Sequence, residues 1–139
     1  MAIKIKTSWK GNMQFESTNP GGNLMIDAGP ENDGMGNGYR PKALMLSSLA
    51  GCSGLDIVPL LKKMRAEVDN IEIDVSANLT EEHPKYYDKV HVTYTFYGNN
   101  LKKNMIEKAV GLSVEKYCGV MEMFRSFAKV TTEIIYVEE

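Results

Sequence analysis

The sequence lacks the features that mark several classes of protein. Its 139 residues carry a net charge of −2, so we expect no basic surface for nucleic acid or an anionic membrane. It has no internal repeat, low-complexity segment or interdomain linker. Hydrophobic residues make up 43% and charged residues 24%, a balance that excludes a disordered chain. We therefore predict a single domain over residues 1–139 with a hydrophobic core.

Long apolar runs are also scarce. Residues 1–6 alternate apolar and charged side chains, which is typical of a strand and not of a secretion signal. The one long apolar stretch, residues 43–61, contains three serines, two glycines, Asp56 and Pro59, a composition that disfavours a membrane span. We expect a cytoplasmic protein, in which cysteines stay reduced or take part in redox or metal chemistry.

Cysteine and histidine are rare, with two residues of each. Cys52 lies in the long apolar stretch, and Cys118 lies in a second stretch with helical spacing. No CxxC or HxxxH spacing is present, so a zinc site built from both cysteines with His83 and His91 is disfavoured and we predict no metal. His83 is expected at the surface, and His91 is expected on a strand, facing solvent or hydrogen-bonded.

The hydrophobic pattern predicts an α+β fold, because strands and helices are grouped in the order βββ-α-ββ-αα-β. The expected strands are residues 3–7, 13–16, 23–27, 71–77, 90–96 and 131–137; the expected helices are residues 41–66, 101–111 and 113–128. The first three strands should form an antiparallel meander, and the next two a hairpin. Gly111 and Ser113 are expected to end one helix and cap the next.

Two segments of this pattern suggest more than secondary structure. Residues 28–39 contain four glycines and few apolar side chains, which predicts a loop long enough to act as a functional flap. The helix at 41–66 is apolar nearly all round as far as Leu61. Because such a helix needs cover on every side, we infer a second subunit.

The two cysteines are the residues best suited to chemistry. The thiolate is the reactive form, so a nucleophilic cysteine needs positive charge or oriented N–H groups nearby. Arg40 and Lys42 precede Cys52, but twelve residues of straight helix span about 18 Å. These cations would therefore have to fold back with the loop at 28–39 or come from a second subunit. Core packing is the alternative for both thiols, because free cysteine is among the most buried residue types.

Two stretches together resemble the OsmC-like family, which includes osmotically inducible protein C and the organic hydroperoxide resistance proteins. They are residues 40–58 (RPKALMLSSLAGCSGLDIV) and residues 112–120 (LSVEKYCGV), and Glu82–Pro84 fits the same family. The resemblance implies an intertwined homodimer with long central helices flanked by sheets. It further implies peroxiredoxin-like reduction of organic hydroperoxides, with Cys52 peroxidatic, Cys118 resolving and no cofactor. A dithiol or thioredoxin-like reductant would restore the thiols.

The sequence departs from this family at two positions. Well-characterised hydroperoxide reductases of the family have a glutamate ten residues before the first cysteine, where this chain has Lys42. They also hold an arginine in an early strand, where this chain has Trp-Lys-Gly-Asn at residues 9–12. The Arg–Glu pair is therefore missing, and Arg40 or Lys10 are the candidates to replace it. We expect Arg40 and Lys42 to hold the Cys52 thiolate and orient the peroxide.

Apolar side chains near the cysteines set the expected substrate class. Leu49, Leu55 and Met121 are expected to line the site and favour organic peroxides over hydrogen peroxide. The missing Arg–Glu pair also motivates an alternative, in which the chain is a non-catalytic small-molecule-binding protein on the same fold.

Overall fold

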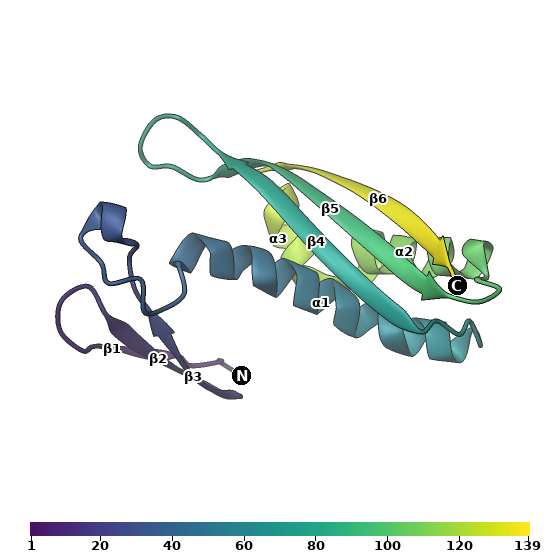
Figure 1. Ribbon diagram of the computed structural model, residues 1–139, viewed down its shortest axis with the longest axis horizontal. Helices are drawn as coiled ribbons and strands as arrows, with labels where there is room; N and C mark the ends of the chain where they lie inside the picture. Colours follow the sequence, from purple (N-terminus) through teal and green to yellow (C-terminus); the bar gives the residue numbers. More distant parts are fainter. The chain divides into compact units, whose positions relative to one another are not determined.

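The computed structural model describes all 139 residues, which form two compact units, Met1–Met45 and Leu46–Glu139 (Figure 1). Each unit contains one three-stranded sheet. The elements are β1 (Lys6–Trp9), β2 (Phe15–Asn19), β3 (Gly22–Ile26), η1 (Pro30–Asn32), α1 (Pro41–Lys63), β4 (Asn70–Leu79), β5 (Tyr87–Gly98), α2 (Lys103–Leu112), η2 (Ser113–Tyr117), α3 (Gly119–Arg125) and β6 (Lys129–Glu138). Their order confirms the predicted α+β class; the single domain over 1–139 stays a prediction.

The first unit is built on the predicted antiparallel meander, with β2 between β1 and β3. Asn19 pairs with Gly22 across a tight turn, as the Asn-Pro-Gly-Gly signal predicts. The predicted strand at 3–7 is shifted, because β1 begins at Lys6. Lys6 pairs with Thr18 and β2 ends one residue later, so the residues before Ile5 have no strand opposite them.

The loop after β3 is held by a buried carboxylate that the sequence analysis did not single out. Asp27 is 1% exposed, and its carboxylate accepts hydrogen bonds from the backbone N–H groups of Ala28 (2.8 Å), Met35 (3.2 Å) and Asn37 (3.0 Å). The bond from Asn37 contributes most to lowering the pKa of Asp27, against the opposing effect of burial. A Cβ on Gly34 would lie 1.9 Å from the Ala28 carbonyl oxygen, so this close approach requires glycine.

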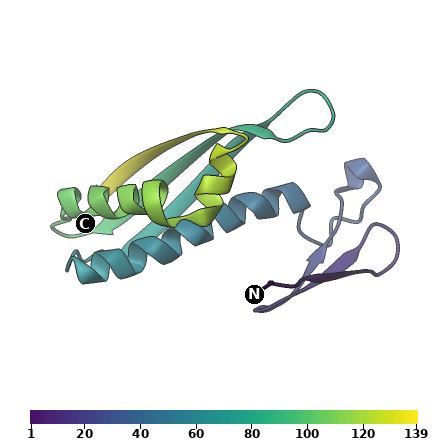
Figure 2. The same cartoon turned by 180° about the vertical axis from the view of Figure 1, so that it is seen from behind.

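The second unit is a sheet covered on one face by helices. β4 and β5 form the predicted antiparallel hairpin, and β6 pairs in parallel with β5. The crossover from β5 to β6 contains α2 and α3, which is why the two strands can run in the same direction. Figures 1 and 2 show α1, α2 and α3 on the same face of this sheet.

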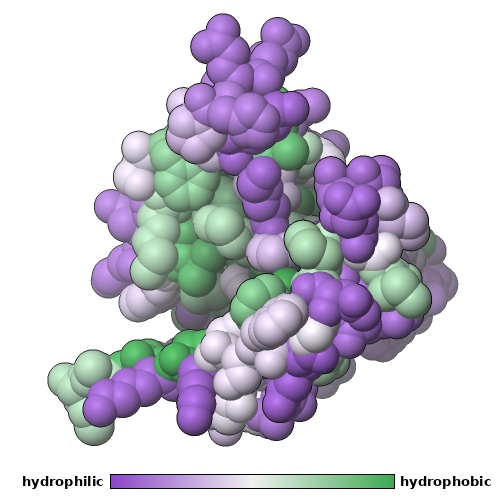
Figure 3. Space-filling view, turned by 90° about the vertical axis from the view of Figure 1, so that its left-hand side faces the viewer, coloured by the Kyte–Doolittle hydropathy of each residue, from purple (hydrophilic) through white to green (hydrophobic).

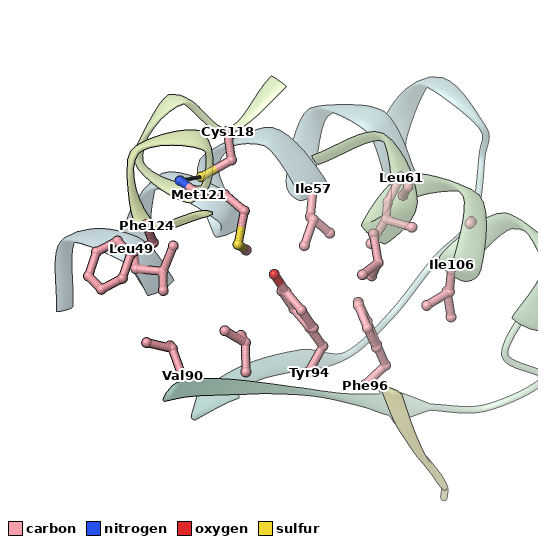
Figure 4. Packing of buried hydrophobic residues seen from close by; sticks show 14 of the residues in the cluster. Leu49, Ile57, Leu61, Val90, Tyr94, Phe96, Ile106, Cys118, Met121 and Phe124 are labelled. Carbon is pink, nitrogen blue, oxygen red and sulfur yellow. Dashed lines mark hydrogen bonds between the residues drawn. The ribbon is translucent and has the colours of Figure 1, made fainter. Parts of the chain in front are cut away.

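The core of the second unit lies between β5 and the helices. Alternate β5 side chains are buried, and in Figure 4 those of Val90, Tyr94 and Phe96 point toward the helices. The buried residues of α1 recur every four positions and form one stripe: Leu49, Ser53, Ile57 and Leu61. An 18-residue window of α1 has a mean hydropathy of 1.6, so the helix is long and apolar enough to cross a membrane, but this stripe packs into the core.

Much apolar surface stays exposed in the single chain. On α1, Leu55 is 80% exposed and Val58 43%, and in the first unit Trp9 is 65% exposed. Figure 3 shows hydrophobic patches between hydrophilic parts of the surface. A second subunit that covers α1 stays a prediction.

Candidate functional site

Cys52 lies on α1, immediately before the buried Ser53. It is half-buried and packs against the edge of the core. Asp56 follows one helical turn later and therefore lies on the same side of α1 as Cys52. Cys52 is thus the more accessible of the two thiols.

Cys118 does not lie in the middle of a helix, which corrects the sequence interpretation. α2 runs into the π-helical turn η2, in which the Cys118 N–H donates to the Ser113 carbonyl oxygen at 2.8 Å. Cys118 then adopts an extended conformation and caps α3, with its Sγ accepting a hydrogen bond from the Met121 N–H at 3.4 Å. Single π turns inside helices are frequent at functional sites.

The prediction that Ser113 caps the following helix is wrong. Ser113 has helical backbone angles and is fully buried, and its hydroxyl faces α1 instead of free N–H groups. Cysteine is not among the preferred N-cap residues, so nothing in the sequence marked position 118 as the cap.

The structure brings the two predicted cysteines together within one chain. Both are free thiols, and Cys52 lies close enough to Cys118 to contribute to the raised pKa of Cys118. Burial raises the pKa of Cys118 from 9.0 to about 11; the Met121 N–H opposes this shift, and the neighbouring Cys52 adds to it. Cys118 is therefore a neutral thiol at physiological pH. Figure 4 shows it above the core, near Met121.

The charge beside this thiol pair is negative. The Asp56 carboxylate raises the pKa of Cys118 further, since it disfavours a second anion nearby. The predicted cations belong to the other unit: Lys42 lies in the first turn of α1, and the Arg40 guanidinium donates to the Gly38 carbonyl oxygen at 2.8 Å. Their action on Cys52 stays a prediction.

A buried chain of hydroxyl groups lies next to the cysteines, and sequence reasoning missed it. The Ser53 Oγ is 2.8 Å from the Tyr94 hydroxyl and 2.8 Å from the Ser113 Oγ. The Ser113 hydroxyl also donates to Asp56 Oδ2 at 3.1 Å. Ser53, Tyr94 and Ser113 are all fully buried. Ser53 follows Cys52 and Ser113 lies five positions before Cys118, and neither position by itself predicts a buried hydrogen bond.

The three residues expected to line a substrate site differ in how far they are exposed. Leu49 and Met121 are fully buried in the core, where Figure 4 shows them near Phe124. Leu55, by contrast, is 80% exposed on α1. The structure therefore does not bring these three side chains together on one open surface of the single chain, and their role in substrate binding stays a prediction.

The two histidines belong to the β4–β5 hairpin, His83 in its connection and His91 on β5. His83 is exposed, and His91 is within 2.7 Å of Thr131 Oγ1 and 2.8 Å of Glu133 Oε1, which confirms a hydrogen-bonded strand residue. The hydrogen bond with His91 is the main cause of a lowered Glu133 pKa. No group of three or more histidine, cysteine, aspartate or glutamate side chains is arranged to hold a metal ion.

Comparisons with known proteins agree with this architecture. Residues 34–133 match the family model for OsmC-like proteins. Protein YhfA of Escherichia coli strain K12 is 26% identical over 129 residues, which are 93% of this chain and 94% of YhfA. A hypothetical protein from Aquifex aeolicus VF5 is similar in structure, with a TM-score of 0.82, 30% identity and 99% of each chain covered.

One further solved structure with a similar fold belongs to a protein that is named for a function. An organic hydroperoxide resistance protein, OsmC, from Legionella pneumophila has a TM-score of 0.72, with 97% of each chain covered. Its identity to this chain is 18%, so this likeness concerns the fold alone.

Proposed function

The chain belongs to the OsmC-like protein family, and on this premise we propose that it reduces organic hydroperoxides by a thiol-dependent, peroxiredoxin-like reaction. One observation carries the proposal: Cys52 and Cys118, 66 positions apart in the sequence, lie close enough for Cys52 to raise the pKa of Cys118. Two interacting free thiols of unequal exposure suit a nucleophile and its resolving partner.

In the first step Cys52 is the nucleophile, because it is the more exposed thiol and Cys118 is held neutral. The Cys52 thiolate attacks the distal oxygen of the hydroperoxide and a sulfur–oxygen bond forms. The oxygen–oxygen bond breaks, and its electron pair leaves with the alkoxide, which takes up a proton and departs as the alcohol. Cys52 is left oxidised as a sulfenic acid.

In the second step Cys118 resolves the sulfenic acid. Its sulfur attacks the Cys52 sulfur, a disulfide forms and the sulfur–oxygen bond breaks. The leaving hydroxide combines with the proton that the Cys118 thiol loses and departs as water. A small dithiol or thioredoxin-like reductant then returns both residues to thiols by disulfide exchange.

Positive charge at Cys52 is assigned to Arg40 and Lys42, because Asp56 supplies the opposite sign. The exposed apolar side of α1 supports a homodimer, and Leu55 on that side would favour an organic substrate, with Leu49 and Met121 shaping the wall behind it. We place the reaction in the cytoplasm, where a dithiol reductant is available.

Rapid-mixing kinetics tests this function. Purified reduced protein is mixed with cumene hydroperoxide and, separately, with hydrogen peroxide, and thiol loss is followed. We expect faster reaction with cumene hydroperoxide, no reaction in Cys52→Ser, and a stable sulfenic acid in Cys118→Ser. Consumption no faster than that by free cysteine, unchanged in Cys52→Ser, would rule the proposal out.

A non-catalytic binding role is the second candidate, and two observations favour it. The charge beside the thiols is a carboxylate, and a groove of about 780 Å³ lies between the end of α1 and the start of β4. Val58, Leu61 and Ile71 contribute apolar surface to this groove, and Lys62 and Arg65 contribute charge. This role predicts unreactive thiols together with a copurifying small molecule, which native mass spectrometry would detect.

A further inference from the structure

Ser113 joins the two segments that carry the cysteines. Its hydroxyl is 2.8 Å from the Ser53 hydroxyl and 3.3 Å from the Ser53 carbonyl oxygen, and Ser53 directly follows Cys52 on α1. At its other end, the Ser113 carbonyl oxygen accepts the hydrogen bond from the Cys118 N–H at 2.8 Å. One residue thus bonds both to the neighbour of Cys52 and to Cys118 itself.

The direction of the hydroxyl chain follows from counting donors. A carboxylate and a carbonyl oxygen only accept, so the single proton of the Ser113 hydroxyl is directed at Asp56 Oδ2 (3.1 Å) and the Ser53 carbonyl oxygen (3.3 Å). Ser113 must then accept from Ser53, and Ser53 must accept from Tyr94. Burial raises the pKa of Tyr94, so its hydroxyl keeps the proton that it donates. Tyr94 donates, and each serine hydroxyl both donates and accepts, which leaves the Ser53–Ser113 contact little freedom to rearrange.

We propose that Ser113 is a positioning residue that holds Cys118 at Cys52 for disulfide formation. The inference rests on the proposed function for its role in turnover. Ser113 acts only on the second step, in which the Cys118 sulfur replaces the hydroxyl group on the Cys52 sulfur and water leaves. It touches neither the peroxide nor the reacting sulfurs, so the first step is independent of it.

The burial of this link explains why it is suited to positioning. Ser53 and Ser113 are fully buried, and every buried side-chain polar atom in the structure has a hydrogen-bond partner. A satisfied buried network fixes one arrangement, because breaking any of its bonds leaves a polar group without water or partner. The Ser53 and Ser113 hydroxyls therefore hold the segments of the two thiols in place without reacting themselves.

The test compares Ser113→Ala with Tyr94→Phe. Ser113→Ala removes the link between the two cysteine segments. Tyr94→Phe is the matched control, because it removes one buried hydrogen bond of the same chain and leaves Ser53 and Ser113 in contact. Each variant is oxidised with one equivalent of cumene hydroperoxide, sulfenic acid is trapped with dimedone, and disulfide formation is followed by loss of both thiols.

We expect Ser113→Ala to form sulfenic acid at the wild-type rate and to close the disulfide at least about tenfold more slowly, since small misplacements of reacting groups lower rates by such factors. Tyr94→Phe should close the disulfide at the wild-type rate, and Ser113→Thr, which keeps the hydroxyl, should restore it. A wild-type closing rate in Ser113→Ala would overturn the proposal, as would equal slowing in Tyr94→Phe. If Ser113→Ala fails to fold, the double variant Ser53→Ala/Tyr94→Phe takes its place. It removes the hydroxyl–hydroxyl bond but leaves the Ser113 contacts with the Ser53 carbonyl oxygen and Asp56, so it should slow closing by a smaller factor, and a wild-type closing rate in it would overturn the proposal.

A second measurement separates this inference from the proposed function. The equilibrium between the dithiol and oxidised glutathione, which gives the Cys52–Cys118 disulfide and two reduced glutathiones, requires no peroxide. Positioning by Ser113 predicts that Ser113→Ala shifts this equilibrium toward the dithiol by about tenfold while Tyr94→Phe does not. A wild-type protein inert to peroxide that still shows this shift would refute only the peroxidase function. An unshifted equilibrium would refute the positioning role.

Discussion

The two units of this protein differ in what lies at their centres. Every buried hydrophobic side chain belongs to Leu46–Glu139, where strand β5 and three helices enclose them. The buried residues of Met1–Met45 are Ser17, Asp27 and Gly29. The second unit is thus stabilised mainly by apolar burial, and the first by hydrogen bonds around one carboxylate. Both thiols therefore lie in the unit that has its own hydrophobic core.

The largest expected effect comes from removing core volume. Phe96 is fully buried in β5 and Trp9 is 65% exposed in β1. Phe96→Ala should lower the free energy of unfolding by about 3–5 kcal/mol, because it deletes buried surface and leaves a cavity. Trp9→Ala should change it by less than about 0.5 kcal/mol, as expected for an exposed side chain. Urea denaturation of both variants at low protein concentration measures the two values.

A loss of unfolding free energy in Trp9→Ala as large as that in Phe96→Ala would contradict the prediction that the two units differ in apolar burial. It would mean that Trp9 is covered in solution, as an assembly of two subunits would require. Repeating the denaturation at higher protein concentration distinguishes the cases, because only a covered Trp9 makes the difference depend on concentration.

The next effect concerns the carboxylate of the first unit. Asp27→Asn keeps the shape of the side chain but cannot accept from all three backbone N–H groups. Amide exchange at Met35 and Asn37 should accelerate roughly tenfold, because each loses a charge-assisted bond. Hydrogen–deuterium exchange followed by NMR checks this, with the β5 amide of Val92 as the internal control. Equal acceleration at Val92 would show that the two units are not stabilised separately.

The two units should also lose stability at opposite ends of the pH scale. The pKa of Asp27 is lowered from 3.8, so its contribution is complete above that value and is lost as the pH falls through the lowered folded pKa. The pKa of Cys118 is raised from 9.0 to about 11, so its contribution is complete below pH 9.0 and is lost as the pH rises toward 11. Amide and methyl NMR signals should therefore change first in the first unit under acid and in the second unit under alkali.

Matched variants control this pH experiment. Asp27→Asn should remove the acid-induced change in the first unit, since it deletes the titrating group. Cys118→Ala should lessen the alkaline change in the second unit and leave the part that comes from the raised pKa of Tyr94. An alkaline transition that persists unchanged in Cys118→Ala would assign it to another group and contradict the prediction.

The smallest expected effect on the free energy of unfolding comes from removing an exposed ion pair, and it should be similar in the two units. Each has an exposed ion pair, Lys10–Glu16 at 3.8 Å in the first and Arg125–Glu122 at 2.7 Å in the second. Glu16→Gln and Glu122→Gln should each alter the free energy of unfolding by no more than about 0.5 kcal/mol, because water screens exposed pairs. Thermal unfolding of the two variants measures this. A larger loss in either would reveal a pair that is buried in solution.

The parts of the fold that could be predicted from the sequence are those set by local spacing. Alternation in residues 71–77 and 90–96 predicted the β4–β5 hairpin, and the turn at Asn19–Gly22 predicted β2–β3. Strand ends were less predictable: β2 covers Phe15–Asn19 where 13–16 was expected, and α1 ends at Lys63 instead of Ala66. The end of a strand depends on which of its residues pair with a neighbouring strand. Ile3 and Ile5, which were expected in a strand, do not pair with β2.

The candidate site was predictable only in its residue types. Cys52 and Cys118 stand out because cysteines are scarce, but the extended cap at Cys118 has no preferred capping residue to announce it. No local pattern marks Asp27, Ser53, Ser113 or Tyr94 as members of buried hydrogen-bond networks. Their roles arise from hydrogen bonds between residues that are distant in the sequence, 60 positions apart for Ser53 and Ser113.

Periodicity, turn residues and the two cysteine-containing stretches determined by themselves the α+β class, the element order and the likeness to the OsmC-like family. Packing alone decided that the two thiols interact, that one of them is held neutral, and that the charge beside them is a carboxylate. The physical reason is that side-chain spacing along the chain acts over a few residues. Burial, by contrast, and the pKa shifts and hydrogen bonds that depend on it, exist only after distant segments have come together.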